Sequence, residues 1–471
     1  MATRVLSADS QFRSVLFNDN ILQLKEGHND SKGQQAPSFT HTDIDILQPR
    51  AAFHQKVPPE ILAKVFTYCV NNDIIQLRSR SRDPQPWILG HICSRWRQIA
   101  LAEPLLWRRI DARGYSPLLS STVSFMHEIL DNRGGSAAVE LQIAPGCRSD
   151  WAILLNLCSE YPSRLRNLHL TIDAWYSPPC LRRPIRTFDD LESLVLVFCR
   201  PSYGGSDIEG ATAITAFSTA HHLRKVEIHR EGSHNPNLID ATSFPWAQLT
   251  SLTISCISTI ALSQILCECV ELTDLVVGLQ VNGSGSHYAL PTTIHLAHLH
   301  SITIQFGVGS DGILDLLTTP ALKTLIFGQW ALASQKCILD LVDRSDCDLE
   351  ILHYPADETP DIVPLLKFMP YLRELIIPTT DPIPQSSLDA IRIMNLSPRL
   401  RAFTFPVDSI LPAIHFLQSR WTKSLSGSYE GIREAKIRIR HEEFALEEVW
   451  YEKVALEFTN DGRMVDIVLI Q

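Results

Sequence analysis

The sequence has no apolar run of the roughly 18 residues that a helix needs to span a bilayer. Positive charge is not in excess either, since 42 Lys and Arg stand against 52 Asp and Glu, for a formal net charge of −10. A general nucleic-acid binder should carry a basic surface. We therefore expect neither a membrane nor a nucleic acid as a partner. Residues 1–17 lack the uninterrupted apolar core of a secretory signal, so none is expected there.

Cysteine pairs with metal-ligand spacing are also missing. The 11 cysteines include no CxxC, and Cys267 and Cys269 form only a CxC inside an apolar, helix-like stretch. This usage favours free, buried thiols of a reducing compartment over disulfides or a metal site. We expect a protein of the cytoplasm, the nucleus or both.

Signatures of catalysis are absent as well. The sequence contains no HExxH, no GxSxG and no GxxxxGK[ST]. The glycines of SYGGSDIEG and VNGSGSH lack the spacing of a nucleotide-binding fingerprint. We therefore expect no enzyme, no catalytic residue, no cofactor and no metal.

The chain does contain apolar material for a large core. Hydrophobic residues make up 45% of its 471 residues and charged residues 20%, as in ordinary globular proteins. The length suggests about three domain-sized units. Pattern changes along the chain predict a flexible N-terminal segment, a helical domain, a repeat domain and a β-rich cap, over residues 1–50, 51–112, 113–425 and 426–471 respectively.

One short pattern, LxxLxL with other apolar residues allowed, recurs through the repeat domain. Its copies start 23 to 32 residues apart, at Leu165, Leu191, Leu223, Leu249, Leu272, Leu299, Leu322, Leu349, Leu372 and Leu400. A repeat of this length and core resembles the leucine-rich repeat. The repeats are irregular, so loops such as residues 198–210 and 279–291 should project from them.

Periodicity explains why such copies would stack. The fourth and sixth residues of each copy point to the same side of a strand. Helix-like segments such as WAILLNLCSEYPSR and STIALSQILCECVE lie between copies. A strand and a helix cannot bury their apolar faces alone, but stacked copies share one core. We predict an α/β fold, an irregular leucine-rich-repeat solenoid (horseshoe) behind a small all-α domain; the alternative is a non-repetitive α/β domain.

The residue between the two strand leucines should face the concave surface of such a solenoid. We predict a partner-binding surface there, formed by His169, Glu227, Thr253, Thr303, Ile326, His353, Ile376 and Thr404, with Val195 and Val276 at the equivalent places. The apolar members Val195, Val276, Ile326 and Ile376 suggest a partly apolar surface, although an inward tilt of irregular strands explains them equally well. His169 and His353 are interpreted as solvated rather than catalytic.

The C-terminal segment has a different pattern. VALEF (454–458) and MVDIVLI (464–470) flank Asn460, Asp461 and Gly462, which predicts a hairpin turn. Terminal repeats of a solenoid need a cover over their exposed core. We interpret residues 426–471 as that cap.

Before the repeats, VPPEILAKVFTYCV (57–70) places apolar residues at helical steps of three and four. Pro58 and Pro59 stand where a helix can begin. The stretch 71–86 carries Arg78, Arg80 and Arg82 and is interpreted as a solvated loop. A second helical pattern follows at 86–110 and is broken by Pro104.

Taken in order, VPPEIL…VF…C, CSRWRQIA and PLLW resemble an F-box, especially the F-box-like modules of fungal proteins. Val57 replaces the usual Leu, and the loop 71–86 is longer than in compact F-boxes. The resemblance implies binding of the Skp-type adaptor of a cullin–RING ubiquitin ligase. The implied adaptor-binding residues are Pro58, Pro59, Ile61, Leu62, Val65 and Phe66, whereas Trp96 and Trp107 should hold the helical core.

The sequence therefore favours a substrate-recognition subunit of an SCF-type cullin–RING E3 ubiquitin ligase. The F-box would bind the Skp-type adaptor, and through it cullin and RING subunits, while the repeats bind a target protein for ubiquitination. The alternative is a non-catalytic leucine-rich-repeat interaction scaffold that joins no ligase and uses the N-terminal helices only as a cap.

Overall fold

The computed structural model describes residues 57–70, 75–76, 87–112, 120–133, 138–144, 148–173, 179–185, 188–199, 214–230, 243–279, 293–307, 310–355, 361–379, 381–424, 432–440 and 464–470. The expected N-terminal segment 1–50, most of the basic loop 71–86, nearly all of the two projecting loops, the strand 454–458 and the turn at 460–462 lie outside these residues. The chain divides into two compact units, Met1–Leu62 and Ala63–Gln471, and each is described by itself.

The described part of the first unit is the start of helix α4 (Pro59–Val70). Proline begins the helix, where its missing N–H removes no helical hydrogen bond. The backbone N–H groups of Ile61 and Leu62 both donate to the carbonyl oxygen of Pro58, at 3.1 Å each. The predicted helix start is therefore confirmed.

The second unit opens with the rest of α4 and a small helical module. It contains α5 (Trp87–Ile92), α6 (Ser94–Ala102) and the 3-10 turn η2 (Pro104–Trp107). The Trp107 indole N–H donates to the carbonyl of Ala100 at 2.8 Å, and the rings of Phe66 and Trp96 lie 4.7 Å apart. Trp96 and Trp107 thus hold this module together, as expected.

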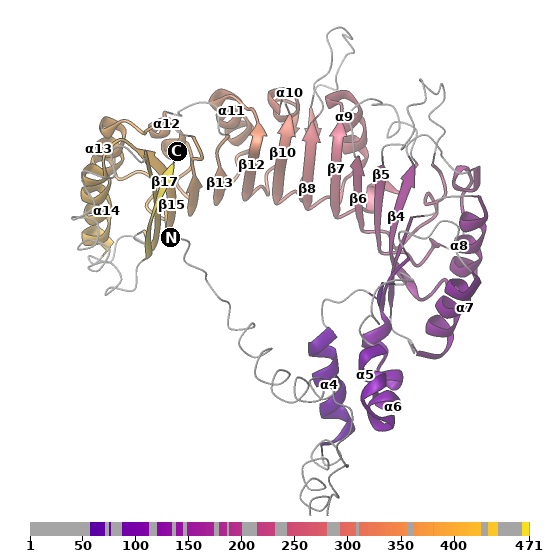
Figure 1. Cartoon of the computed structure of the whole chain (residues 1–471). Helices are drawn as coiled ribbons and strands as arrows, with labels where there is room; N and C mark the ends of the chain where they lie inside the picture. Colours follow the sequence, from indigo (N-terminus) through magenta and orange to yellow (C-terminus); the bar gives the residue numbers. More distant parts are fainter. Residues whose placement is uncertain are drawn as a thin grey trace, which may run out of the picture. The chain divides into compact units, whose positions relative to one another are not determined.

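One parallel sheet runs through the rest of the second unit. Within the described residues its 15 strands follow chain order, and the short strands β9 (Ile294–His295) and β11 (Leu317–Thr318) pair apart from it (Figure 1). The strands of the large sheet are β1 (Ile75–Gln76), β2 (Arg109–Asp111), β3 (Val139–Ile143), β4 (Leu165–Asp173), β5 (Ser193–Cys199), β6 (Lys225–Arg230), β7 (Ser251–Ile257), β8 (Asp274–Leu279), β10 (Ser301–Gly307), β12 (Thr324–Ala331), β13 (Ile351–His353), β14 (Glu374–Ile376), β15 (Ala402–Val407), β16 (Glu434–Arg440) and β17 (Met464–Ile470).

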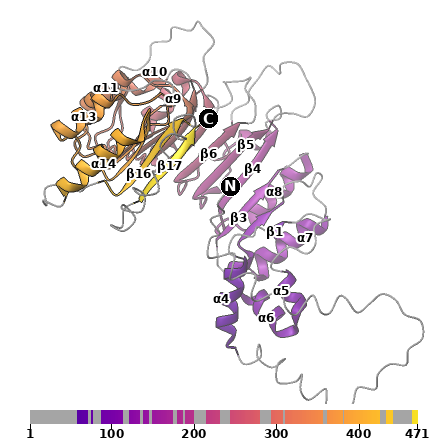
Figure 2. The ribbon, with the colours of Figure 1, turned by 60° about the vertical axis from the view of Figure 1, so that its left-hand side comes forward.

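Helices connect many of these strands and lie along one side of the sheet (Figures 1 and 2). They are α7 (Ser120–Glu128), α8 (Arg148–Glu160), α9 (Thr259–Glu268), α10 (Ser310–Leu314), α11 (Gln335–Ser345), α12 (Ile362–Phe368), α13 (Gln385–Met394) and α14 (Ile410–Ser424). Side chains of Ser258, Ser334 and Asp361 cap α9, α11 and α12. Asp346 and Asn395 end α11 and α13 in the left-handed conformation, so the chain can turn back towards the next strand.

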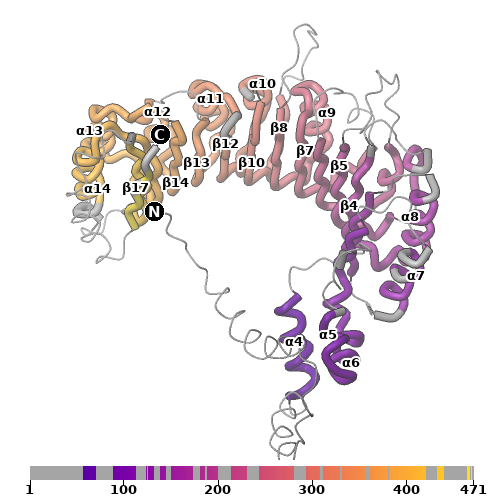
Figure 3. The backbone as a smooth tube through the Cα atoms, in the orientation of Figure 1, coloured from indigo at the N-terminus to yellow at the C-terminus, as the bar shows by residue number. Residues whose placement is uncertain are grey.

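The buried face of the sheet follows the repeated pattern. In a typical copy Leu272, Leu275 and Val277 are almost fully buried, and the other copies bury the same three positions. The backbone passes from one strand–helix unit to the next through the repeats (Figure 3). The prediction of an α/β solenoid of leucine-rich-repeat type is confirmed, and the sheet is open.

The sheet extends beyond the copies that the leucine pattern identified. Strand β2 lies inside the predicted helical range 51–112, and β16 and β17 lie inside the predicted cap. Strand β17 pairs with β16 in parallel, which continues the solenoid. At β16 the core residues are Ile432, Ala435 and Ile437, so the pattern persists with smaller or branched side chains.

Candidate interaction surfaces

Helix α4 exposes one apolar face. Ile61, Val65 and Tyr68 are 48%, 45% and 77% exposed, and their spacing of four and three residues places them on the same side of the helix. Pro58 and Pro59 at its start are exposed as well. Four of the six predicted adaptor-binding residues, Pro58, Pro59, Ile61 and Val65, are therefore accessible.

The opposite face of α4 is buried. Leu62, Phe66 and Val70 follow the same helical spacing, and Phe66 is 0% exposed against Trp96. Leu62 and Phe66, the other two predicted adaptor-binding residues, therefore belong to the interior. Cys69, which the helical spacing placed with the apolar residues, is exposed.

Further apolar side chains are exposed on the helical module of the second unit. Ile88 and Ile92 lie on α5, and Leu105 lies on the 3-10 turn. Neither these residues nor Tyr68 was singled out from the sequence. For Tyr68 the signal was present, because it stands seven residues after Ile61.

The predicted concave-face residues form one continuous row, called the central row below. Strand pairing aligns His169, Val195, Glu227, Thr253, Val276, Thr303, Ile326, His353, Ile376 and Thr404 on consecutive strands. The row continues through Lys436 and Asp466. All ten predicted members are half-buried, the apolar ones included. The apolar members are therefore partly accessible, which is compatible with a partly apolar surface.

A chain of polar contacts crosses the central row on β6 and β7. Glu227 binds Lys225 Nζ at 2.8 Å and His229 Nε2 at 3.2 Å, and His229 Nδ1 lies 3.4 Å from Ser255 Oγ. Burial alone would raise the pKa of Glu227, but hydrogen bonds and charges from Lys225 and His229 outweigh it. The net effect is a lowered pKa, so Glu227 is ionised at neutral pH.

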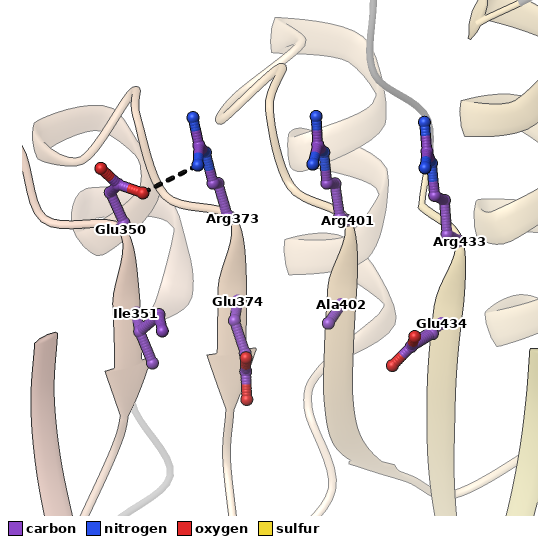
Figure 4. Close-up of a pocket in the computed structure, with 8 residues that line it drawn as sticks. All are labelled: Glu350, Ile351, Arg373, Glu374, Arg401, Ala402, Arg433 and Glu434. Carbon is purple, nitrogen blue, oxygen red and sulfur yellow. Dashed lines mark ion pairs between the residues drawn. The ribbon is translucent and has the colours of Figure 1, made fainter. Parts of the chain in front are cut away.

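A second row lies at or immediately before the start of the strands, at the second position of each repeat, and is called the strand-start row below. Backbone N–H groups link it residue by residue through Arg166, Glu192, Arg224, Thr250, Thr273, His300, Lys323, Glu350, Arg373, Arg401 and Arg433. At β13–β16 it borders a hollow of about 400 Å³ that Ile351, Glu374, Ala402 and Glu434 also line (Figure 4). The sequence analysis did not identify this row, although its first ten members occupy the second position of the ten LxxLxL copies.

The cysteines add no reactive site among the described residues. All nine that the structure describes are free, and Cys158, Cys269, Cys337 and Cys347 are buried as expected. Burial raises the pKa of Cys158 and of Cys269 to about 12, which keeps both thiols protonated and poorly nucleophilic. Cys267 is exposed, so the expectation of buried thiols is wrong for it and for Cys69.

The described part of the chain contains no group of three or more His, Cys, Asp or Glu residues placed to hold a metal ion. None of its helices combines the length and the apolar character needed to cross a bilayer.

Comparisons with known proteins add little to this geometry. No protein-family model matches the sequence, and no curated protein matches it. Among solved structures, the chain is similar to an internalin (inlF) from Listeria monocytogenes at 12% identity, with a TM-score of 0.38, over 79% of this chain and 94% of that one. A score that low carries no argument, so the solenoid assignment depends on the strand order and register above.

Proposed function

We propose that the chain is a substrate-recognition subunit of an SCF-type cullin–RING E3 ubiquitin ligase. Helix α4 would bind the Skp-type adaptor, and the central row would hold a target protein. The protein would perform no chemistry itself, because tethering a target raises its effective concentration near the ligase. This role would place it in the cytoplasm or nucleus.

The observation that carries the proposal is the two-sided apolar character of α4. A surface helix normally buries its apolar stripe and turns its polar face to solvent. Helix α4 buries Leu62, Phe66 and Val70, yet leaves Ile61, Val65 and Tyr68 in solvent. An apolar face of this kind is suited to a protein partner.

The test uses substitutions on the exposed face alone. Ile61→Ser with Val65→Ser should abolish co-purification of a Skp-type adaptor with the full-length chain, while the unfolding midpoint stays unchanged. Ile393→Ser, at a residue that is 73% exposed on α13, is the matched control and should leave capture intact. Adaptor capture that survives the double substitution would overturn the proposal.

The scaffold alternative has its own supporting observation. Two of the residues that the F-box resemblance assigns to the adaptor, Leu62 and Phe66, are buried. In that case the helices would only cover the first strands. Wild-type chain that captures no adaptor, but still captures a target through the repeats, would favour the scaffold.

A further inference from the structure

Three arginines stand side by side at the C-terminal end of the strand-start row. The backbone N–H of Arg401 donates to the carbonyl of Arg373 at 2.8 Å, and that of Arg433 donates to the carbonyl of Arg401 at 2.7 Å. These residues immediately precede β14, β15 and β16, so their backbones are about 4.8 Å apart. Their side chains extend in the same direction (Figure 4).

Elsewhere in the strand-start row, charged residues on adjacent strands have opposite signs. Arg166 binds Glu192 at 2.8 Å on the neighbouring strand. Glu350 lies between Lys323 and Arg373, at 3.6 Å and 2.9 Å. Opposite charges on adjacent strands are stabilising, and like charges directly opposite each other are destabilising.

The alternation ends after Arg373. Arg401 and Arg433 follow it on consecutive strands, and from Lys323 to Arg433 the row holds four cations and one carboxylate, a net charge of +3. The hollow as a whole is balanced, because Glu350, Glu374 and Glu434 also line it, so the two signs of charge are separated rather than unequal. Such a run of like charges on adjacent strands costs stability.

The hollow beside these arginines is polarised. Its wall at the strand starts carries Arg373, Arg401 and Arg433, whereas Glu374 and Glu434 point away from the guanidinium groups (Figure 4). Glu374 also lies 3.1 Å from His353 Nε2. Ala402, with its small side chain, leaves the middle of the hollow open. One side therefore suits anions, and the other side suits N–H donors.

We propose that Arg373, Arg401 and Arg433 bind an anionic, extended peptide segment of the protein that the repeats hold. This inference specifies the class of target, so it rests on the proposed function, in which the repeats hold a target protein. Each guanidinium can form paired hydrogen bonds with a carboxylate or a phosphate. The outer two arginines are about 10 Å apart and alternate side chains of an extended peptide about 7 Å, so two acidic groups at i and i+2 fit the three arginines.

The experiment measures binding of fluorescent peptides to the purified full-length chain by anisotropy. Three matched peptides carry glutamate, glutamine or phosphoserine at alternate positions. We expect the glutamate and phosphoserine peptides to bind and the glutamine peptide not to bind. The tighter of the two anionic peptides identifies whether carboxylates or phosphates are the preferred source of charge.

Substitutions locate the site. Arg401→Gln with Arg433→Gln should weaken binding of the anionic peptide by about 10- to 100-fold, because two charge-assisted contacts are lost. Arg166→Gln with Arg224→Gln, in the alternating part of the same row, is the matched control and should leave affinity unchanged. Arg433→Lys should cause a smaller loss of affinity, because lysine keeps the positive charge but cannot form the paired hydrogen bonds of a guanidinium.

Several results would overturn the inference. They are equal binding of the glutamine peptide, equal losses in the two double variants, or tighter binding of a single-stranded oligonucleotide at the same arginines. Capture of the Skp-type adaptor is measured on the same protein. Lost adaptor capture with intact peptide binding refutes the ligase role alone, whereas intact capture without peptide binding refutes the arginine site alone.

Discussion

The helical module and the repeats differ in how completely they bury their apolar side chains. Every repeat buries its three leucine-type positions, and Leu275 and Leu375, for example, are almost wholly buried. The helical elements instead leave Val65, Ile88 and Ile92 in solvent. A stacked repeat can complete its core with its neighbours, whereas a short helical module has too few residues to enclose all of its own apolar surface. The difference indicates that the module is suited to a partner and the repeats to their own stability.

The largest expected effect comes from emptying the core of the helical module. Phe66→Ala removes a ring that is fully buried against Trp96, and we expect a loss of about 4 kcal/mol in the module's free energy of unfolding. Hydrogen exchange should show fast exchange in α4, α5 and α6 with protection retained in β7–β14. Equal loss of protection in the helical module and in the repeats would show that the two do not unfold independently, and would contradict this prediction.

A core substitution in the repeats sharpens the same contrast. Leu375→Ala on β14 should lower the free energy of unfolding of the solenoid by about 3 kcal/mol, because the cavity is enclosed on both sides by neighbouring repeats. Chemical denaturation followed by circular dichroism measures this change. Thr404→Ala, in the central row of the next strand, is the control and should change stability by less than about 0.5 kcal/mol.

The smallest expected effect concerns the polar contacts of the central row. Lys225→Met removes a hydrogen bond and a positive charge from Glu227, so the pKa of Glu227 should rise. Because the folded-state pKa is lowered, its stabilising contribution is present above the unfolded pKa and is lost as pH falls through the folded one.

The wild-type advantage over Lys225→Met should therefore be under about 1 kcal/mol at neutral pH and should fade below about pH 4. Carboxyl chemical shifts from an NMR titration give the pKa of Glu227. Lys436→Met, whose partner is Asp466 at 3.8 Å, should not change it. An unchanged pKa in Lys225→Met would contradict the assigned contacts.

The repeats could be predicted from the sequence because each copy has three apolar positions that must be buried. Leu165, Leu168 and Leu170 must all face the core, so periodicity alone predicts the strand and its buried side. The same reasoning predicted the central row. If every strand starts at the same position of its repeat, equivalent residues pair on neighbouring strands. Strands β2 and β3 were missed because few leucines mark them, although Ile110 on β2 pairs in register with Leu141 on β3, and Leu141 pairs with Leu168.

Accessibility was harder to predict than secondary structure. Ile61 and Leu62 are adjacent, equally apolar and both part of the F-box resemblance, yet one is exposed and the other buried. Both lie on the broad apolar stripe of α4, and only the tertiary packing decides which part of that stripe is covered. The arginines of the strand-start row were missed because a search for buried positions passes over the second residue of each copy.

Parallel pairing in chain order makes the sheet a linear array in which each strand contacts only its two neighbours. Adding or deleting one repeat would therefore move the three arginines relative to β2 by about 4.8 Å without redesign of either end. Repeat number therefore acts as an adjustable spacer between the first strands of the sheet and these arginines.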